Sequence, residues 1–290
     1  MSEDQIIVQL NPDVPPTGSD LGVVNAARKS FGRRSEWAPE SQCPTDPHTG
    51  GKIPPYNRLK DKDKRLLEFL ARGMTADDFD DVVSHIHSEA CWADVYDEEH
   101  MYDDDYSGIN FKPLIERLWQ WRNTPTHESP FGHAFFSFEV KLPIFLARQM
   151  VKHKFLRWSE YSRRYITEDV EFYQHDYREA AQDKKQGSGG THKNNTDWQL
   201  QALAHNQYQL DLYNSMITDG VAPEQARGVL PQDLMTAVTW SGSLDAFAHM
   251  CKLRLGSDAQ KEAQVVAKEV YKHLKDQCPV AAPLLVEGVY

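Results

Sequence analysis

Residues 148–164 are the part of the chain whose residue types best suit binding chemistry. They carry six basic side chains and one acidic one, Glu160, although the whole chain has a formal net charge of −11. Cations packed this densely repel one another, and an anionic ligand relieves the repulsion. Gln149, Ser162 and Tyr165 add directional donors and acceptors among these cations. The mixture favours a site for a phosphorylated polar ligand over a solvated surface that merely pairs with acidic residues.

Two arginines outside this segment are further candidates for an anion site. Arg227 stands in EQARGVLP and Arg254 in CKLRLGSDAQ, each where a predicted helix meets a loop. A guanidinium can bind a phosphate or carbonyl group through two parallel hydrogen bonds. By composition alone such arginines are more often ordinary surface residues, so their assignment to a site depends on the other motifs in the sequence.

The composition of the 290-residue chain excludes several classes of protein. Hydrophobic residues make up 40% and charged residues 26%, which is typical of a folded globular chain. The net negative charge argues against a nucleic-acid partner, and the absence of a long apolar run or a signal-peptide pattern predicts a cytoplasmic protein without a membrane partner. The cysteines form no CxxC pair, which predicts reduced and mostly buried thiols; they are Cys43, Cys91, Cys251 and Cys278.

The hydrophobic pattern of the first half predicts a helix, a strand and a second helix. Leu66, Leu67 and Leu70 share one face of a helix over residues 61–72. The aromatic run FFSFEV predicts a strand at residues 135–140. Pro143 then suits the first turn of a helix that places Gln149, Lys152 and His153 on one face; its buried-side candidates are Phe145, Leu146, Met150 and Val151.

The second half is predicted to be mainly helical. Residues 184–195 predict a Gly- and Lys-rich loop, followed by a long helix to about residue 219, which Gly220 ends, and a short helix from Pro223. Ser243 is a candidate N-cap for the next helix, and Ser257 forms a capping-box pattern that begins the last one, which Pro279 stops. No clean linker separates two core-sized halves, so we predict a single domain over residues 1–290 with an acidic insertion at about 73–110.

Beyond these general patterns, the basic segment carries a recognisable signature. It reads Lys152-His153-Lys154 and, after a spacer, Glu160-Tyr161-Ser162-Arg163-Arg164-Tyr165. The chain therefore resembles flavin-dependent thymidylate synthases, whose signature is an Arg-His-Arg triplet, a spacer and Glu-x-Ser-x-Arg-Tyr. Further blocks stand in the family's order: VVNAARKSF, THESPFGHAFFSFEVKLPIFLARQ, KKQGSG, EQARGVLP and LRLGSDAQKE. The resemblance covers residues 21–34, 56–72 and 112–275.

The resemblance implies a fold, a reaction and an assembly. The fold would be α/β (α+β), with a central, mostly antiparallel sheet flanked by helices. The protein would be a homotetramer whose active sites are shared between chains. FAD, reduced by NADPH, would mediate transfer of a one-carbon unit from 5,10-methylenetetrahydrofolate to carbon 5 of dUMP, giving dTMP.

The resemblance also implies roles for single residues. Nucleotide-binding residues would be Gln149, Glu160, Tyr161, Ser162, Arg163 and Arg164 of one chain, with Arg227 and Arg254 of others. Flavin-binding residues would be Ser30, His127, Ser129, Lys152, His153, Lys154, Phe155, Ser243 and His249. Arg254 and Ser162 are the candidate catalytic residues, because Arg254 would stabilise the negative charge that develops as carbon 5 becomes nucleophilic. No histidine stands at a spacing that guarantees a base beside Ser162, so binding is its better-supported role.

Several positions depart from the family, and they gather on the flavin side. Lysines replace the outer arginines of the triplet, which keeps the charge but loses the planar fork. The other departures are Gly132 for a glutamate, Ser243 for an asparagine, Asp245 for an arginine and Asp258 for a histidine. The nucleotide site is thus predicted to follow the family more closely than the flavin site does.

Three alternatives to thymidylate synthesis stay open at this point. One is a flavin-dependent enzyme that modifies carbon 5 of another pyrimidine nucleotide, by methylation of dCMP or by hydroxymethylation. The second is a non-catalytic relative that only binds nucleotide. A metal hydrolase built on His85 and His87 is the third and the least favoured, since the H-x-H spacing is common in helices that hold no metal.

Overall fold

The computed structural model describes residues 2–39, 58–72, 84, 127–162, 164, 170–181 and 187–287. Internal contacts divide the chain into two compact units. The first comprises Met1–Ser19 and Phe131–Val286, and the second comprises Asp20–Pro130 and Glu287–Tyr290. The predicted single domain over 1–290 stays a prediction, and apart from Ser84 the predicted insertion lies outside the described residues.

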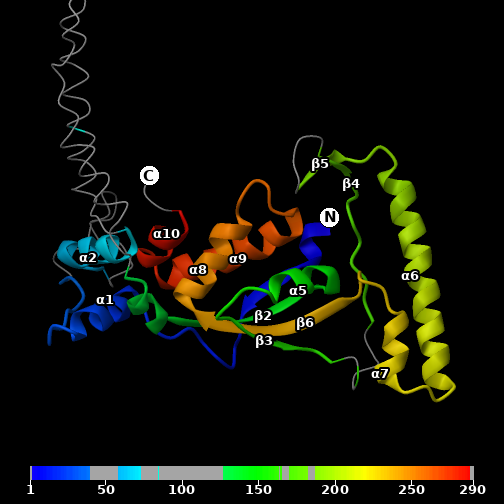
Figure 1. The fold of residues 1–290 in the computed structure, drawn as a ribbon, viewed down its shortest axis with the longest axis horizontal. Coiled ribbons are helices and arrows are strands. Elements are labelled where there is room, and N and C mark those ends of the chain that lie inside the picture. Colours follow the sequence, from blue (N-terminus) through cyan, green and yellow to red (C-terminus); the bar gives the residue numbers. More distant parts are fainter. Residues whose placement is uncertain are drawn as a thin grey trace, which may run out of the picture. The chain divides into compact units, whose positions relative to one another are not determined.

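A four-stranded antiparallel sheet organises the first unit (Figure 1). Its strands are β1 (Ile7–Leu10), β2 (Phe135–Pro143), β6 (Met235–Ser243) and β3 (Arg157–Glu160), in that spatial order. Both β2 and β3 are antiparallel to β6, so they run parallel to each other. The helix α5 (Ile144–Met150) connects them across β6. The predicted central antiparallel sheet with flanking helices is confirmed.

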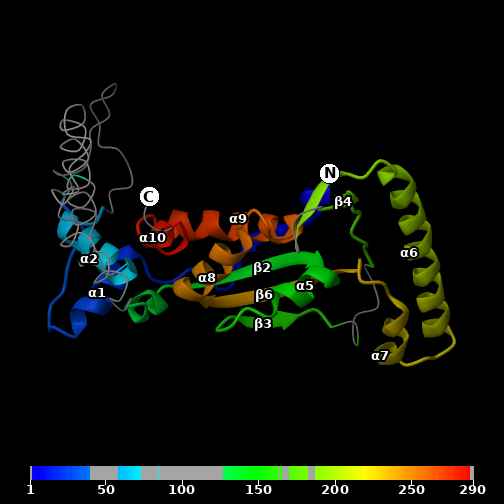
Figure 2. The same cartoon turned by 45° about the horizontal axis from the view of Figure 1, so that its top comes forward.

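One face of this sheet is apolar and carries the core. Phe138 and Trp240 are paired across β2 and β6, and both rings contact Phe247 edge-on, at 5.0 and 5.2 Å between centroids. Phe247 belongs to α8 (Leu244–Arg254), which packs against α9 (Lys261–Gln277) and α10 (Ala281–Val286). Figures 1 and 2 both show α8 and α9 along this face. Alternation of apolar and polar residues along β2 and β6 therefore fixes which side of the sheet the helices cover.

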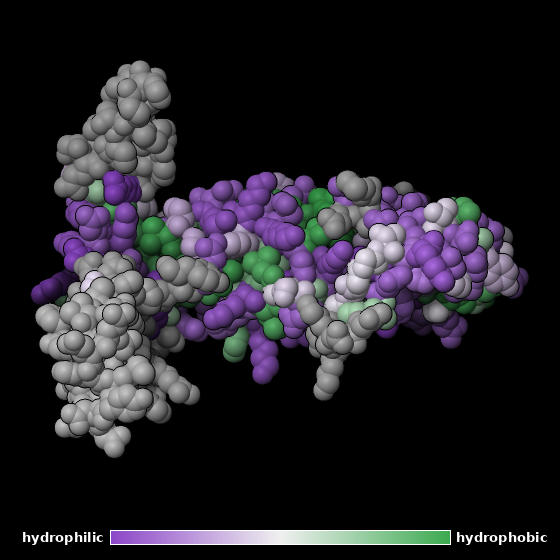
Figure 3. All heavy atoms as spheres, turned by 90° about the horizontal axis from the view of Figure 1, so that it is seen from above, coloured by the Kyte–Doolittle hydropathy of each residue, from purple (hydrophilic) through white to green (hydrophobic). Residues whose placement is uncertain are grey.

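The other face of the sheet is polar. The hydroxyl groups of Ser137 and Ser241, paired across β2 and β6, lie 2.8 Å apart. The neighbouring cross-strand pair is also polar, since Thr239 Oγ1 donates to Glu139 Oε1 at 2.7 Å. Figure 3 shows the first unit from above, and on this side its surface is mostly hydrophilic with small apolar patches. Within the described ranges, no helix combines the length and hydropathy needed to cross a bilayer.

The remaining part of the first unit is built around the long helix α6 (Asn195–Thr218). Gly220, at φ 85°, follows its end, and the short helices α7 (Pro223–Ala226) and η4 (Arg227–Val229) pack against it. A hairpin of β4 (Arg178–Ala180) and β5 (Ser188–Thr191) precedes it. The predicted long helix (α6) and the predicted short helix from Pro223 (α7) are confirmed. The predicted loop over 184–195 is wrong where the chain forms the strand β5. Backbone pairing with β4 gives that Gly-rich segment a structure that its composition does not favour.

The second unit contains α1 (Asp20–Lys29) and α2 (Asp61–Arg72), the latter with its predicted bounds. The two helices are joined by Arg28, whose Nε donates to Asp63 Oδ1 at 3.0 Å. Ser35 Oγ donates to the other oxygen of this fully buried carboxylate. Because a buried charge is costly without partners, these bonds compensate for the burial of the Asp63 carboxylate.

Three sequence predictions about helix ends and faces need correction. The helix α5 ends at Met150, so Lys152 and His153 lie in the turn after it and do not share a helical face with Gln149. For the same reason Val151 is exposed rather than buried. The helix α9 begins at Lys261 and not at the capping-box pattern of Ser257, because residues 255–259 form a turn. Two of the four cysteines, Cys251 and Cys278, form no disulfide and are buried as predicted; Cys43 and Cys91 lie outside the described residues.

Candidate active site

The connection from α5 to β3 carries most of the residues singled out from the sequence. Phe155 has a left-handed backbone (φ 65°) and an 80% exposed side chain. This conformation costs a non-glycine residue roughly 1–2 kcal/mol. Gly242 of β6 makes room for the turn, because a Cβ there would collide with Leu156 Cδ2 and lie 3.4 Å from the Phe155 carbonyl oxygen. The turn is therefore pressed onto β6 and presents an aromatic ring to solvent, which is an arrangement typical of ligand sites.

Three of the predicted nucleotide-binding residues line one small cavity. Glu160 at the end of β3, Tyr161 after it and Arg227 of η4 meet at a cavity of about 100 Å³. Glu160 accepts hydrogen bonds from Thr236 Oγ1 at 3.1 Å and from Trp158 Nε1 at 3.3 Å. The other residues that line the cavity are Ile144, Leu230, Leu234, Met235 and Thr236. A carboxylate and a guanidinium of one chain thus face the same space, with apolar walls around them. The resemblance implies that Arg227 reaches the nucleotide from another chain, and that assignment stays a prediction.

Ser162 and Arg164 follow directly along the chain. The Ser162 hydroxyl oxygen accepts hydrogen bonds from Arg164 Nε at 3.2 Å and from its backbone N–H at 3.4 Å. No histidine is among the partners of Ser162 in the described part of the chain, so nothing there activates it as a nucleophile. Arg163 lies outside the described residues.

Arg254 and His153 are in direct contact, although 101 residues separate them. Arg254 ends α8, and its Nε donates to His153 Nε2 at 3.1 Å. Burial, and then the charge of Arg254, lower the pKa of His153 to about 4. Burial also lowers the pKa of Arg254 from its usual value. The imidazole is therefore neutral at physiological pH. The two residues flanking it, Lys152 and Lys154, are exposed.

With this geometry in view, the comparison with known proteins decides the family. Residues 61–280 match the Thy1 family, described as thymidylate synthase complementing protein. The chain belongs to this family. It is 37% identical over 171 residues to the flavin-dependent thymidylate synthase of Thermus thermophilus, and the match covers 58% of this chain and 61% of that enzyme, less than two thirds of its length. With the flavin-dependent thymidylate synthase of Thermosipho melanesiensis the identity is 35%, over 53% of this chain and 68% of the relative.

The fold of this Thy1 family member is also found among solved structures. The UMP/dUMP methylase PolB of Streptomyces cacaoi, bound with 5-Br dUMP, aligns with a TM-score of 0.60 over 96% of this chain and 93% of that chain. Its complex with 5-Br UMP aligns with a TM-score of 0.61. The sequence identities are 22% and 20%, so these likenesses establish the fold.

Two of the departures from the family meet in space. Gly132 and Asp245 are 113 positions apart in the sequence, yet a Cβ atom on Gly132 would lie 3.9 Å from Asp245 Oδ1. Apart from its neighbours along the chain, this Cβ atom would have no other atom of the described residues within 4 Å. This carboxylate oxygen is buried and has no hydrogen-bond partner there. A bound group with a donor would satisfy it, and the missing side chain of Gly132 leaves open space beside it. Together with the exposed ring of Phe155, these features fit a flavin.

The other residues predicted to contact flavin fall in both units. Ser243 precedes α8 and makes no side-chain capping bond, and His249 is exposed on the same helix. In the second unit, Ser30 Oγ donates to the Ala27 carbonyl at 3.0 Å, and His127 stacks on Phe69 at 6.3 Å between centroids. Ser129 begins the short helix η3 (Ser129–His133). The assignment of all of them to flavin stays a prediction, as does the site shared between chains.

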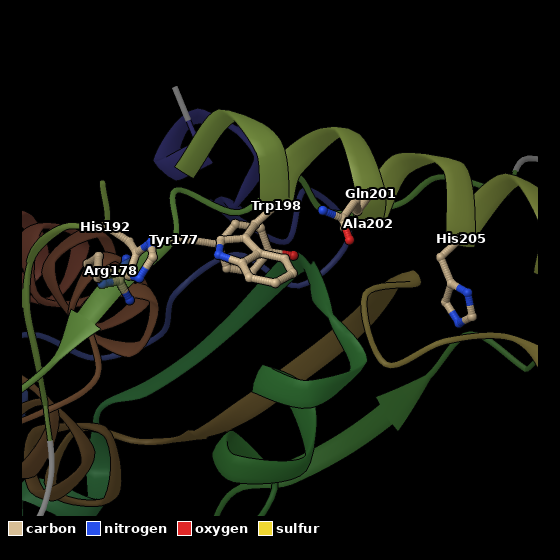
Figure 4. Close-up of a pocket in the computed structure, with 7 residues that line it drawn as sticks. All are labelled: Tyr177, Arg178, His192, Trp198, Gln201, Ala202 and His205. Carbon is tan, nitrogen blue, oxygen red and sulfur yellow. The ribbon is translucent and has the colours of Figure 1, made fainter. Parts of the chain in front are cut away.

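A larger cavity of about 560 Å³ lies between the hairpin and α6 (Figure 4). Trp198, Gln201, Ala202 and His205 of α6 line one side, and the hairpin region supplies the rest: Tyr177, Arg178 and His192. Arg178 is already neutralised, since its Nη2 donates to both carboxylate oxygens of Glu262, at 2.8 and 3.0 Å. The cavity contains none of the predicted site residues. Sequence reasoning missed it because it depends on the β4–β5 hairpin.

Proposed function

We propose that the protein makes dTMP from dUMP, with 5,10-methylenetetrahydrofolate as one-carbon donor and with FAD, reduced by NADPH, as hydride mediator. Carbon 5 of the pyrimidine gains a methylene group and loses its proton, and the hydride converts methylene into methyl. The observation that carries this proposal is the cavity where Glu160, Tyr161 and Arg227 meet, in a chain whose named relatives are flavin-dependent thymidylate synthases.

The residues assigned to the nucleotide suit a pyrimidine monophosphate, and of Arg227, Arg164 and Gln149 it is Arg227 that lines the cavity. Arg227 and Arg164 supply guanidinium groups, which bind phosphate oxygens through paired hydrogen bonds. Gln149 on α5 has a side-chain oxygen that is buried and has no partner among the described residues. An unsatisfied buried acceptor costs about 1–3 kcal/mol. The N3–H of uracil is a donor of the required kind, so dUMP binding would remove this cost.

We assign the action on the base to the terminal nitrogens of Arg254, as the family resemblance implies. Its guanidinium is partly buried, and a positive charge is more effective where water is partly excluded. Directed at a uracil carbonyl, it would stabilise the negative charge that accumulates when carbon 5 attacks the one-carbon unit. Bound reduced FAD would supply the hydride. In this chain Phe155, His249 and the open space at Gly132 would hold its ring system, and Lys152 and Lys154 its phosphates.

A homotetramer with shared sites is part of the proposal, and the surface of α6 supports self-association. This helix has 24 residues, of which only Asp197 and Asp211 are acidic and none is lysine or arginine. It leaves large apolar side chains exposed; they are Trp198, Leu200, Leu203, Tyr208 and Leu212. A helix with apolar side chains on several sides is normally covered by other protein surfaces on those sides. Light scattering should therefore find particles of about four times 33.2 kDa, and monomers alone would contradict the assembly.

The test of the reaction is anaerobic incubation of the protein with FAD, NADPH, methylenetetrahydrofolate and one nucleotide, followed by mass analysis of the product. We expect methylated product from dUMP. UMP belongs in the panel because PolB is described as a UMP/dUMP methylase, and dCMP because the sequence leaves the base open. Hydroxymethylated product would reassign the reaction. Nucleotide binding without any product would indicate a non-catalytic relative.

A further inference from the structure

The side chain of Arg254 is held by one of its three nitrogens. Its Nε donates to His153 Nε2, and the described residues offer its two terminal NH₂ groups no other partner. The arginine is thus anchored at the root of the guanidinium while the outer edge stays available. Two parallel donors on that edge are what an arginine needs in order to bind a phosphate or a carbonyl group in a fixed orientation.

The histidine that anchors it is itself held firmly. The His153 backbone N–H donates to the Met150 carbonyl at 3.2 Å, and its ring lies against Trp240, at 6.5 Å between centroids. Trp240 is 1% exposed and is packed between Phe247 and Trp158. The imidazole lies in the turn after α5, and it is supported there by a residue of the sheet core.

The hydrogen bond also fixes the protonation of the ring. An Nε2 atom that accepts a hydrogen bond carries no proton, so the neutral ring has its proton on Nδ1. The lowered pKa of His153, about 4, keeps the ring in this form at neutral pH. The contact consequently persists under physiological conditions.

We infer that His153 is a positioning residue for Arg254: it holds the guanidinium by Nε so that both terminal NH₂ groups point at the nucleotide. This role differs from direct contact with flavin, which the family resemblance implies for the triplet. The inference rests on the proposed function for the identity of the ligand. The positioning itself depends only on the His153–Arg254 contact.

Two variants of His153 separate this role from a structural one. In glutamine the side-chain oxygen can reach the place of Nε2, whereas the shorter asparagine carries its oxygen near the place of Nδ1 and leaves Arg254 without an acceptor. At saturating FAD, His153→Asn should weaken dUMP binding roughly tenfold in calorimetric titration, the equivalent of one hydrogen bond to a charged group. His153→Gln should stay within about threefold of the unmodified protein.

A double-mutant cycle with Arg254→Ala then tests whether the effect passes through Arg254. In that background His153→Asn and His153→Gln should bind dUMP equally. A tenfold loss that persists without Arg254, or a failure of glutamine to restore binding, would overturn the inference. Equal melting temperatures of the two His153 variants would exclude misfolding as the cause.

Crystal structures of the two variants test the positioning without any ligand. The Arg254 side chain should be ordered in His153→Gln and disordered in His153→Asn. If the unmodified protein bound no pyrimidine nucleotide, the proposed function would fail, but this structural comparison would still decide the inference. An equally ordered Arg254 in both variants would refute it.

Discussion

Glu160 and Asp245 are two carboxylates of the candidate active site that are held in opposite ways. Glu160 stands on β3 and accepts hydrogen bonds from Thr236 and Trp158. Asp245, in the first turn of α8, has a buried oxygen without a partner among the described residues. A carboxylate whose bonds come from a sheet is costly to replace, because its loss leaves donors unpaired. A carboxylate without such bonds is easier to exchange.

This contrast matches where the chain departs from its family. Apart from Arg254, which ends α8, the residues assigned to the nucleotide follow the family signature and lie on or next to β3, α5 and η4. Of those assigned to flavin, Lys152 and Lys154 lie in a turn, Gly132 in the short helix η3 and Asp245 in the first turn of α8. The rigid sheet thus supports the part of the site that has been kept.

The largest expected effect is on the nucleotide side. Arg254→Ala should lower the turnover number about a hundredfold, as the loss of one preorganised charge stabiliser typically does. Steady-state kinetics with saturating FAD and dUMP measure it. Lys252→Ala, an exposed cation of the same helix, is the control and should change little. An unchanged turnover number in Arg254→Ala would remove this residue from the mechanism.

Arg227 should matter for binding of the nucleotide rather than of FAD. Removing one arginine from a phosphate site should weaken dUMP roughly tenfold or more, because charge-assisted bonds are stronger than neutral ones. Calorimetric titration of Arg227→Ala with dUMP and with FAD tests this. The matched control is Lys268→Ala, an exposed cation on α9. Equal losses of affinity for dUMP and for FAD would show that Arg227 does not belong to the nucleotide part of the site alone.

His153 belongs to the triplet assigned to flavin and contacts Arg254, which is assigned to the nucleotide. This histidine should make the stability of the protein depend on pH. A histidine whose folded pKa is lowered binds its proton more readily in the unfolded chain, so acid favours unfolding. The stability that neutral His153 contributes is complete above about pH 6.5 and is lost as the pH falls toward 4. With partial solvent exposure, we expect a loss of about 1 kcal/mol at pH 5 relative to pH 7.

Urea unfolding at fixed protein concentration measures this loss. In His153→Gln the pH-dependent loss should shrink by that amount, because glutamine does not titrate. His205→Gln, which alters an exposed histidine of α6, serves as the control. Identical pH profiles for the unmodified protein and His153→Gln would show that His153 is as easily protonated in the folded as in the unfolded state.

The last expected effect is on the flavin side. Changing both Lys152 and Lys154 to arginine should tighten FAD by about 1 kcal/mol per recovered charge-assisted bond, since arginine offers a planar fork where lysine offers a point charge. Quenching of flavin fluorescence measures the affinity. Lys268→Arg combined with Lys272→Arg, both exposed on α9, controls for arginine content. No change in affinity would argue that the triplet does not hold flavin phosphates.

How much of this could be predicted from sequence depends on how local each signal is. The helices α2 and α6 and the strand β2 were predictable, because periodicity, a terminating glycine and an aromatic run each lie within the element itself. The strand β6 was not recognised, although TAVTWS alternates in the manner of a strand. The short strands β1 and β3, of four residues each, are stabilised mainly by pairing with their neighbours.

The same distinction between local and long-range signals applies to the candidate active site. The motif of residues 152–165 indicated which residues to consider, because a family signature is a local pattern. Contacts between distant segments were not predictable. The bond between His153 and Arg254 needs α5 to cross over β6 and α8 to pack on the same face of the sheet. The cavity shared by Glu160 and Arg227 requires η4 to lie beside the end of β3.

The closeness of Gly132 and Asp245 also constrains how this lineage could have changed. From an ancestor with glutamate and arginine at these positions, replacing the arginine first would have set two carboxylates against each other, since the Cβ at 132 lies 3.9 Å from the Asp245 oxygen. Replacing the glutamate first leaves an unpaired arginine beside an exposed glycine, where water can reach its charged end. The less costly historical order is glycine first and aspartate second. Reversion meets the same barrier from the other side, so a descendant could regain the glutamate only after position 245 had lost its negative charge.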